Sequence, residues 1–178
     1  MEETKHQDEE EVTRRSLLKT ACIAGAGAAV LISGLNGRAD ASGGTYPQVR
    51  IANVKDVKAG KAVKFDYPLA GRKNILINCG CSTEGGVGAE KSIVAYSSFC
   101  THLGCGVDIE KESGMLVCEC HQSIYDPKQS GKVVEGPAPN SLPMVALNVD
   151  KNGDIYAVGV AGLIYGMRNN LLDGEEVK

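Results

Sequence analysis

Histidine is scarce in this chain: its 178 residues include only three, His6, His102 and His121. Any site that needs imidazole groups therefore has few positions to use. His102 and His121 each lie within three residues of two cysteines, in the stretches CTHLGC and CECHQS. Because both residue types bind metals, this clustering indicates a metal centre.

The chain also lacks a concentration of positive charge. It has 19 lysine and arginine residues against 22 aspartate and glutamate residues, which gives a formal net charge of −3. Binding to nucleic acid or to an anionic membrane surface is typical of proteins with a basic patch, and the sequence has none. We therefore expect no nucleic-acid partner.

The apolar run near the N-terminus is short. It covers residues 21–35, whereas a helix needs roughly 20 residues to span a bilayer core. It follows the paired arginines of TRRSLLK and precedes ADA, the small-x-small pattern that a signal peptidase accepts. These features resemble a twin-arginine (Tat) export signal. We therefore expect residues 1–41 to be a signal peptide that is removed on export to the periplasm, although a retained signal would leave the protein associated with the membrane.

The remaining segment, residues 42–178, has no long stretch with the 3.6-residue period of an amphipathic helix, so a helical bundle is not expected. It contains short runs of β-forming residues between turn residues. The clearest is a hairpin, VALNVDKNGDIYAVGV, in which Asn152 and Gly153 supply the turn. The sequence thus predicts one all-β domain. Its expected strands are residues 49–54, 61–69, 74–79, 92–97, 115–120, 132–136 and the two arms of the hairpin at 145–160.

The two cysteine and histidine stretches have the spacing C-x-H-x2-C, twelve residues, then C-x-C-H. A tetrahedral zinc ion would take four of these six side chains. A two-iron cluster is the other possibility, with two cysteines on one iron and two histidines on the other. Each stretch would then donate one thiolate and one imidazole. The spacing alone leaves both metals open.

CTHLGC at 100–105 and CECHQSIYD at 118–126, followed by GPAP at 136–139, resemble the Rieske iron-sulfur proteins. The resemblance implies a Rieske-type antiparallel β-sandwich, with a small cluster-binding subdomain of two loops at about residues 98–140. It implies one 2Fe-2S cluster per chain, and its ligands would be Cys100, His102, Cys118 and His121. It also implies a disulfide between the second cysteines, Cys105 and Cys120. Rieske-type oxygenases generally lack that pair, so its presence favours the electron-transfer branch.

The same resemblance assigns a tuning role to two hydroxyls. Those of Ser123 and Tyr125 would donate hydrogen bonds to a bridging sulfide and to a ligand sulfur, and so stabilise the reduced cluster. One departure is Glu119, which stands where the family usually has proline. Cys79 and Cys81 belong to no family motif, and we expect them to be strand-end residues without a chemical role.

Two longer stretches, residues 85–105 and 153–174, resemble the small subunit of arsenite oxidase. That resemblance implies a large catalytic subunit with a molybdenum-pterin centre, which oxidises arsenite and passes electrons through this chain to a cytochrome c or a small copper protein. No catalytic residue is expected on this chain, because its two mature histidines are both assigned to iron. The alternatives are the Rieske subunit of a quinol-cytochrome c oxidoreductase complex and a free-standing soluble Rieske electron carrier.

Overall fold

The computed structural model describes residues 45–177. The expected signal peptide, residues 1–41, lies outside the described residues, so its export role and its cleavage remain predictions. Within the described part of the chain, regular structure consists of β-strands and a single 3-10 turn, η1 (Pro127–Gln129). The all-β prediction is therefore confirmed.

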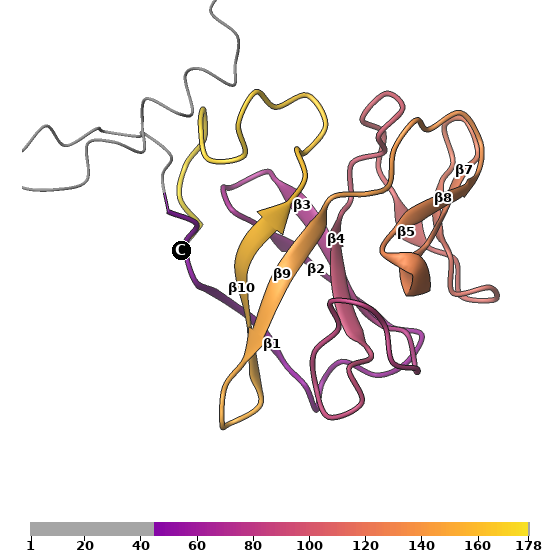
Figure 1. Ribbon diagram of the computed structural model, residues 1–178. Helices are drawn as coiled ribbons and strands as arrows, with labels where there is room; N and C mark the ends of the chain where they lie inside the picture. Colours follow the sequence, from indigo (N-terminus) through magenta and orange to yellow (C-terminus); the bar gives the residue numbers. More distant parts are fainter. Residues whose placement is uncertain (1–44, 178) are drawn as a thin grey trace, which may run out of the picture. The chain divides into compact units, whose positions relative to one another are not determined.

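Six antiparallel strands form the larger sheet, in the order β1-β10-β9-β4-β3-β2. The first and last strands of the domain thus lie side by side, while β4 and β9 join the two halves of the sheet (Figure 1). The strands are β1 (Val49–Asn53), β2 (Ala62–Asp66), β3 (Lys73–Asn78), β4 (Ile93–Ser97), β9 (Met144–Val149) and β10 (Asp154–Ala161).

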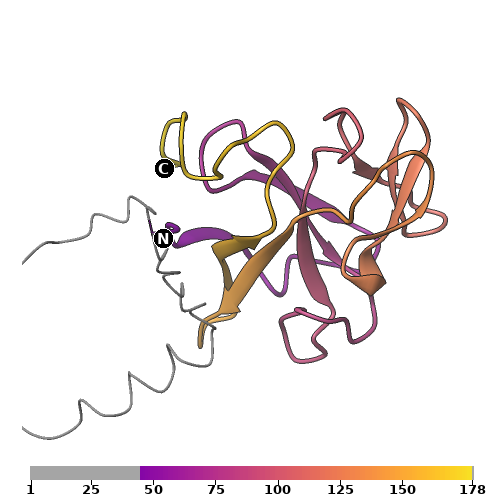
Figure 2. The ribbon, with the colours of Figure 1, turned by 45° about the horizontal axis from the view of Figure 1, so that its top comes forward.

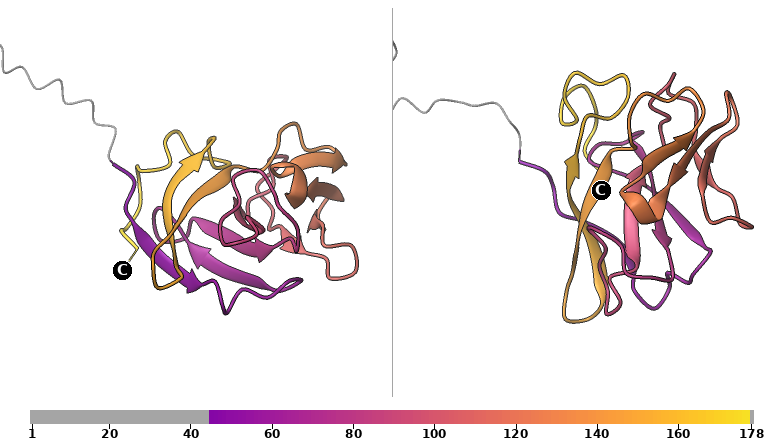
Figure 3. Two further views of the ribbon diagram at one scale, coloured as in Figure 1. Left: turned by 60° about the horizontal axis from the view of Figure 1, so that its bottom comes forward. Right: turned by 45° about the vertical axis from the view of Figure 1, so that its right-hand side comes forward.

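A smaller antiparallel sheet of four strands lies within residues 98–140, the part expected to bind the cluster. Its order is β5-β6-β7-β8, and it lies beside β3 and β4 of the larger sheet (Figures 1 and 3). The cluster-binding part is therefore a small sheet that carries the two loops. Its strands are β5 (Asp108–Ile109), β6 (Leu116–Cys118), β7 (Ser123–Asp126) and β8 (Lys132–Glu135).

The apolar run of β3 is buried on both faces because successive side chains of a strand point to opposite sides. Ile75 and Ile77 pack in a cluster with Leu116 and Tyr125 of the smaller sheet. Leu76 points the other way, into a second cluster with residues of β9 and β10. Each fully buried aliphatic side chain contributes about 1.5–3 kcal/mol relative to exposure. The first cluster therefore fixes the smaller sheet, and the loops on it, against the rest of the domain.

The segment after β10, residues 162–177, begins beside the cluster-binding part and runs along the outside of the domain to the turn between β2 and β3, where Glu176 pairs with Leu69 (Figures 1 and 2). Asn170 is buried and bonds three groups: its side chain accepts from the Ile164 N–H and donates to the Gly162 carbonyl and to the Tyr46 hydroxyl. The buried side chain of Ile164 anchors the same turn. This C-terminal segment is thus held in place at its beginning by side-chain hydrogen bonds and packing.

Candidate metal centre

The first loop, box one (residues 100–105), follows β4 and closes on itself. Its ends are joined by a bridge between Phe99 and Gly106 and by a 2.8 Å hydrogen bond from the Cys100 N–H to the Cys105 carbonyl. Within it, the Gly104 N–H donates to the Cys100 carbonyl over 2.9 Å. Gly104 has a φ of 76°, a conformation that glycine adopts without steric cost. The tight turn sets the backbone of Cys100 and its neighbours.

The second loop, box two (residues 118–123), is the turn between β6 and β7. Cys118 and Ser123 pair across the base of this hairpin. Gln122 takes a φ of 57°, and its side chain donates to the Glu119 carbonyl over 3.0 Å. Glu119 itself is exposed, so the carboxylate that replaces the family's usual proline lies at the surface. Box two is thus held by strand pairing at its base and by a side-chain hydrogen bond across the turn.

A disulfide between Cys105 and Cys120 joins the two loops. Their sequence separation is 15, and closing a loop of this length stabilises a fold by about 3 kcal/mol in the chain-entropy model. The bridge is the one that the family resemblance implied. Both sulfurs lie within 4.8 Å of the Cys118 sulfur, but as disulfide sulfurs they are not available as thiolate ligands.

Cys100 and Cys118 are free thiols, and both are buried. Burial alone would raise the pKa of Cys100, but hydrogen bonds led by that of the Tyr125 hydroxyl outweigh it and lower this pKa. Burial raises the pKa of Cys118, and the adjacent Cys100 raises it further. The two thiols thus affect each other's ionisation, and a bound cation would let both ionise.

The two imidazoles form a second pair. The ring centroids of His102 and His121 lie 4.7 Å apart with the planes at 86°. Nδ1 of His102 is buried and has no hydrogen-bond partner. A buried polar atom of this kind is rare in native proteins and needs an explanation. A metal ion on this nitrogen would supply the missing partner.

The pairing of like with like distinguishes the two candidate metals. A tetrahedral zinc ion with bonds of about 2.0–2.3 Å would hold all four donor atoms within about 4 Å of one another. Among residues 45–177, no three of the four predicted ligands have donor atoms within 4.8 Å of one another. In this structure the two thiols lie together and the two imidazoles lie together. A Rieske cluster requires this arrangement, because one iron binds two cysteines and the other iron binds two histidines. The donor set therefore fits a 2Fe-2S cluster.

Tyr125 of β7 is completely buried beside this donor set, with its hydroxyl 3.1 Å from Cys100 Sγ. The Thr101 N–H donates to the same oxygen over 3.1 Å, and Thr101 Oγ1 donates to the Asn140 carbonyl over 2.6 Å. Burial, followed by the hydrogen bond with Cys100, raises the pKa of Tyr125 to about 12. The phenol thus stays protonated and can donate to the sulfur.

Ser123 connects box two to the proline loop (residues 136–139). Its side chain is completely buried, and Oγ accepts from the Ala138 N–H over 3.2 Å. Gly136 has a φ of 89°, and a Cβ there would lie 2.5 Å from the Ser123 Cα. The proline loop therefore packs directly on box two, which only glycine at this position permits.

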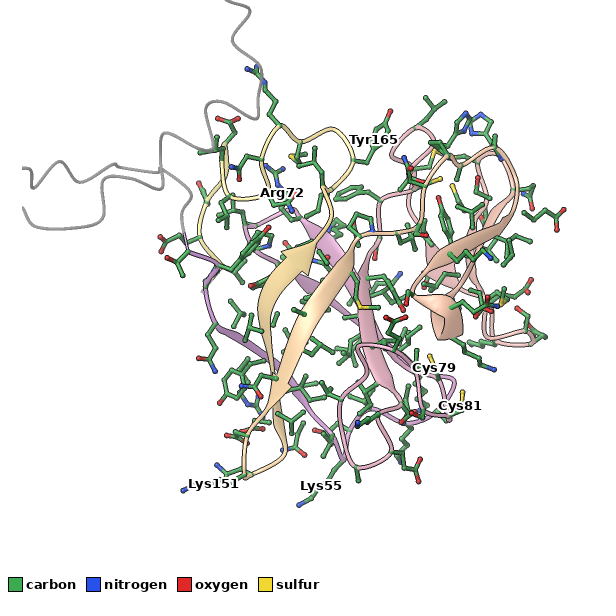
Figure 4. The ribbon with its side chains drawn as sticks, viewed as in Figure 1. Lys55, Arg72, Cys79, Cys81, Lys151 and Tyr165 are labelled. Atoms are coloured by element: carbon green, nitrogen blue, oxygen red, sulfur yellow. A yellow bond between two sulfur atoms is a disulfide. The ribbon has the colours of Figure 1, made fainter. Side chains whose placement is uncertain are left out.

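Thr101 and Asn140 were not singled out from the sequence, although Thr101 links the Tyr125 hydroxyl to the end of the proline loop. The sequence offered one signal for Thr101, which is a polar residue directly after the proposed ligand Cys100. Cys79 and Cys81 lie elsewhere, just after β3, and Figure 4 shows them far from Tyr165 in that view. Cys79 is half-buried and Cys81 is exposed. Nothing in their surroundings assigns them to the metal centre.

Comparison with known proteins agrees with this geometry. A sequence model of the Rieske 2Fe-2S domain matches residues 48–146. The iodate reductase subunit IdrB of Denitromonas iodatirespirans is 38% identical over 166 residues, covering 89% of this chain and 86% of the relative. IdrB of Pseudomonas sp. (strain SCT) is 40% identical over 124 residues, covering 68% and 64%. Among solved structures, the soluble domain of Rieske protein II from Sulfolobus acidocaldarius has a TM-score of 0.59 and 29% identity, covering 77% of this chain and 85% of that one.

Proposed function

Since this chain belongs to the Rieske 2Fe-2S domain family, we propose that it is the electron-transfer subunit of an oxidoreductase whose catalytic subunit carries a molybdenum-pterin centre. The Rieske domain binds a 2Fe-2S cluster, and we assign its ligands here as Cys100, His102, Cys118 and His121. The observation that carries this assignment is the separation of the donors into a buried thiol pair and an imidazole pair on two loops joined by a disulfide.

When bound, the cluster supplies one-electron transfer at a potential above that of all-cysteine clusters. The two kinds of proposed ligand differ in their exposure to solvent. The thiols are buried under box one and β7, whereas His121 is exposed and His102 is half-buried. An electron can therefore reach or leave the cluster through the imidazole side. In the described part of the chain no histidine is left for substrate chemistry, which supports a separate catalytic subunit.

The substrate of that subunit is proposed from two sources. The resemblance of residues 85–105 and 153–174 to the arsenite oxidase small subunit favours arsenite, with electrons leaving through a cytochrome c or a small copper protein. The relatives named as iodate reductase subunits favour iodate, with electrons flowing in the opposite direction. Both are oxyanion reactions that a one-electron relay can serve. Because the two relatives are named as iodate reductase subunits, we place iodate first and arsenite second.

We also propose that the protein is exported to the periplasm by the twin-arginine route, on the basis of the expected signal in residues 1–41. No helix within residues 45–177 is long and apolar enough to cross a membrane. N-terminal sequencing of the purified protein tests the cleavage: a mature chain beginning at Ser42 is expected, and a chain that keeps its leader would contradict it.

The test of function is purification of the native complex, followed by two assays. Molybdenum and iron should be present together. Arsenite-dependent reduction of cytochrome c identifies an arsenite oxidase, whereas iodate consumption driven by reduced cytochrome c identifies an iodate reductase. The matched control is the complex with His121→Ser, in which both electron-transfer assays should fail while molybdenum is retained. A purified chain that is associated with haem and no molybdenum would contradict the proposal.

A further inference from the structure

An uncharged groove lies beside the metal centre, on the side of the C-terminal segment. It has a volume of about 550 Å³, and box one, the residues after the proline loop and the start of the C-terminal segment line it. All of its lining residues are uncharged. A second groove, near β2 and Cys120, differs because Lys64, Asp66 and Glu119 line it.

The rim of this uncharged groove is apolar and exposed. Leu163 is 54% exposed and Tyr165 is 37% exposed, although the residue between them, Ile164, is buried. The hydrogen bonds of Asn170 hold this turn, so the two exposed side chains are presented by a fixed backbone. Exposed apolar groups held in this way are typical of interaction sites.

Tyr165 also contacts box one. A Cβ on Gly104 would lie 2.7 Å from a Tyr165 ring carbon, so the ring packs directly against the bare glycine backbone. The residue before Gly104, Leu103, is 58% exposed. Leu163 and Tyr165 thus form an apolar rim of the groove, and Figure 4 shows Tyr165 on the side of the C-terminal segment that faces box one.

The groove is connected to a proposed cluster ligand. Thr101 lines it, and the Thr101 N–H donates to the Tyr125 hydroxyl, which lies 3.1 Å from Cys100 Sγ. A protein seated in the groove is therefore separated from a ligand sulfur by two hydrogen bonds. The match to the family's sequence model ends at residue 146, before the C-terminal wall of the groove begins.

We propose that this groove and its apolar rim are the docking surface for the catalytic subunit, which inserts an uncharged, apolar segment there. This inference rests on the proposed function. An electron relay has two partners, the catalytic subunit and the soluble carrier, and the uncharged lining indicates which of them binds in this groove. A mobile carrier protein is steered by complementary charge, whereas permanent subunit interfaces are the more apolar class. The soluble acceptor or donor would then use the exposed imidazole side.

The experiment uses the whole complex, purified through a tag on this chain, with molybdenum per tagged chain as the measure of bound catalytic subunit. Leu163→Asp and Tyr165→Asp should each reduce that ratio at least tenfold. Leu172→Asp is the matched control, because Leu172 is equally exposed (49%) on the same C-terminal segment but does not line the groove. It should leave the ratio unchanged. The cluster's electron paramagnetic resonance (EPR) signal must persist in all three variants, which shows that the domain is folded.

A second experiment tests the same docking surface in the wild-type protein. Amide hydrogen exchange at residues 161–165 should be slower in the wild-type complex than in the isolated chain. Wild-type molybdenum in both groove variants, or equal loss in Leu172→Asp, would overturn the docking surface and leave the proposed function standing. A wild-type chain without molybdenum would overturn the proposed function itself. Self-association of the isolated chain that Leu163→Asp abolishes, with molybdenum unchanged, would assign the groove to a second copy instead.

Discussion

The hydroxyl of Tyr125 lies 3.1 Å from Cys100 Sγ at a position with no solvent access. The Thr101 N–H already donates to this hydroxyl oxygen, and Thr101 Oγ1 directs its proton to the Asn140 carbonyl. With those donors placed, the phenol proton can point at the sulfur or at Thr101 Oγ1, which lies 3.3 Å away. Cys100, whose pKa the Tyr125 hydrogen bond lowers against the effect of burial, is the natural acceptor.

Tyr125→Phe should lower the reduction potential of the cluster. The lost hydrogen bond is stronger to the reduced, more negative cluster, so its removal destabilises that state. A difference of about 1.4 kcal/mol between the two oxidation states corresponds to about 60 mV for one electron, and we expect a decrease of tens of millivolts by voltammetry. Tyr96→Phe is the control: Tyr96 is equally buried, but its hydroxyl donates to the Pro127 carbonyl. Equal shifts in both variants would contradict the role of Tyr125.

Ser123→Ala should lower both the potential and the stability. The variant loses a hydroxyl that also lowers the pKa of Cys100 and leaves the Ala138 N–H without its acceptor. An unsatisfied buried donor costs about 1–3 kcal/mol, which thermal unfolding would detect. Ser98→Ala is the matched control, because the buried Ser98 hydroxyl has no partner to lose. An unchanged potential and melting temperature in Ser123→Ala would contradict this assignment.

Gly136→Ala should detach the proline loop from box two. The new Cβ would lie 2.5 Å from the Ser123 Cα and 2.6 Å from the Gln122 carbonyl oxygen, and both are backbone atoms. Gly60→Ala separates the cost of the backbone conformation from the cost of the steric clash, because Gly60 also has a positive φ (72°) but open space around it. Gly60→Ala should cost only the backbone strain of about 1–2 kcal/mol, whereas Gly136→Ala should cost more and release iron faster. Similar unfolding free energies would show that the loop yields to the clash.

The free cysteines outside the metal centre should react at different rates. With Cys100 and Cys118 bound to iron, only Cys79 and Cys81 remain as thiols among residues 45–177. Cys81 is exposed and should be alkylated first. Burial raises the pKa of Cys79, and because the thiolate is the reactive form, its rate should still increase with pH above the usual thiol range. Peptide mass spectrometry after timed iodoacetamide labelling measures both. Labelling of Cys100 or Cys118 at a similar rate would contradict their role as ligands.

Strands with a strong apolar pattern were predictable from the sequence. The runs of β3 and β4 are buried on both faces and stand out against their turns. β5 has two residues, and the SIYD of β7 has a mixed pattern, so neither was predicted. These strands exist because they pair with β6, an interaction that local sequence does not encode.

The metal centre shows the same division between local and tertiary information. The family resemblance of the two boxes was enough to propose the ligands, because the residues that carry it lie close together in the sequence of each box. Thr101 and the Asn140 carbonyl are 39 residues apart, and their hydrogen bond depends on how the proline loop packs. The contact of Tyr165 with Gly104 is likewise set by the path of the C-terminal segment. Such contacts between distant segments could be found only from the three-dimensional structure.

Metal and sulfide analysis of the purified protein, combined with EPR spectroscopy after reduction, tests the proposed cluster most directly. We predict about two irons and two acid-labile sulfides per chain and a rhombic EPR signal of the Rieske type. His102→Ser and His121→Ser should each abolish this signal, because the imidazole pair distinguishes the site from an all-cysteine cluster. A chain that contains one zinc and no iron would contradict the assignment, and so would a Rieske signal that persists in both histidine variants.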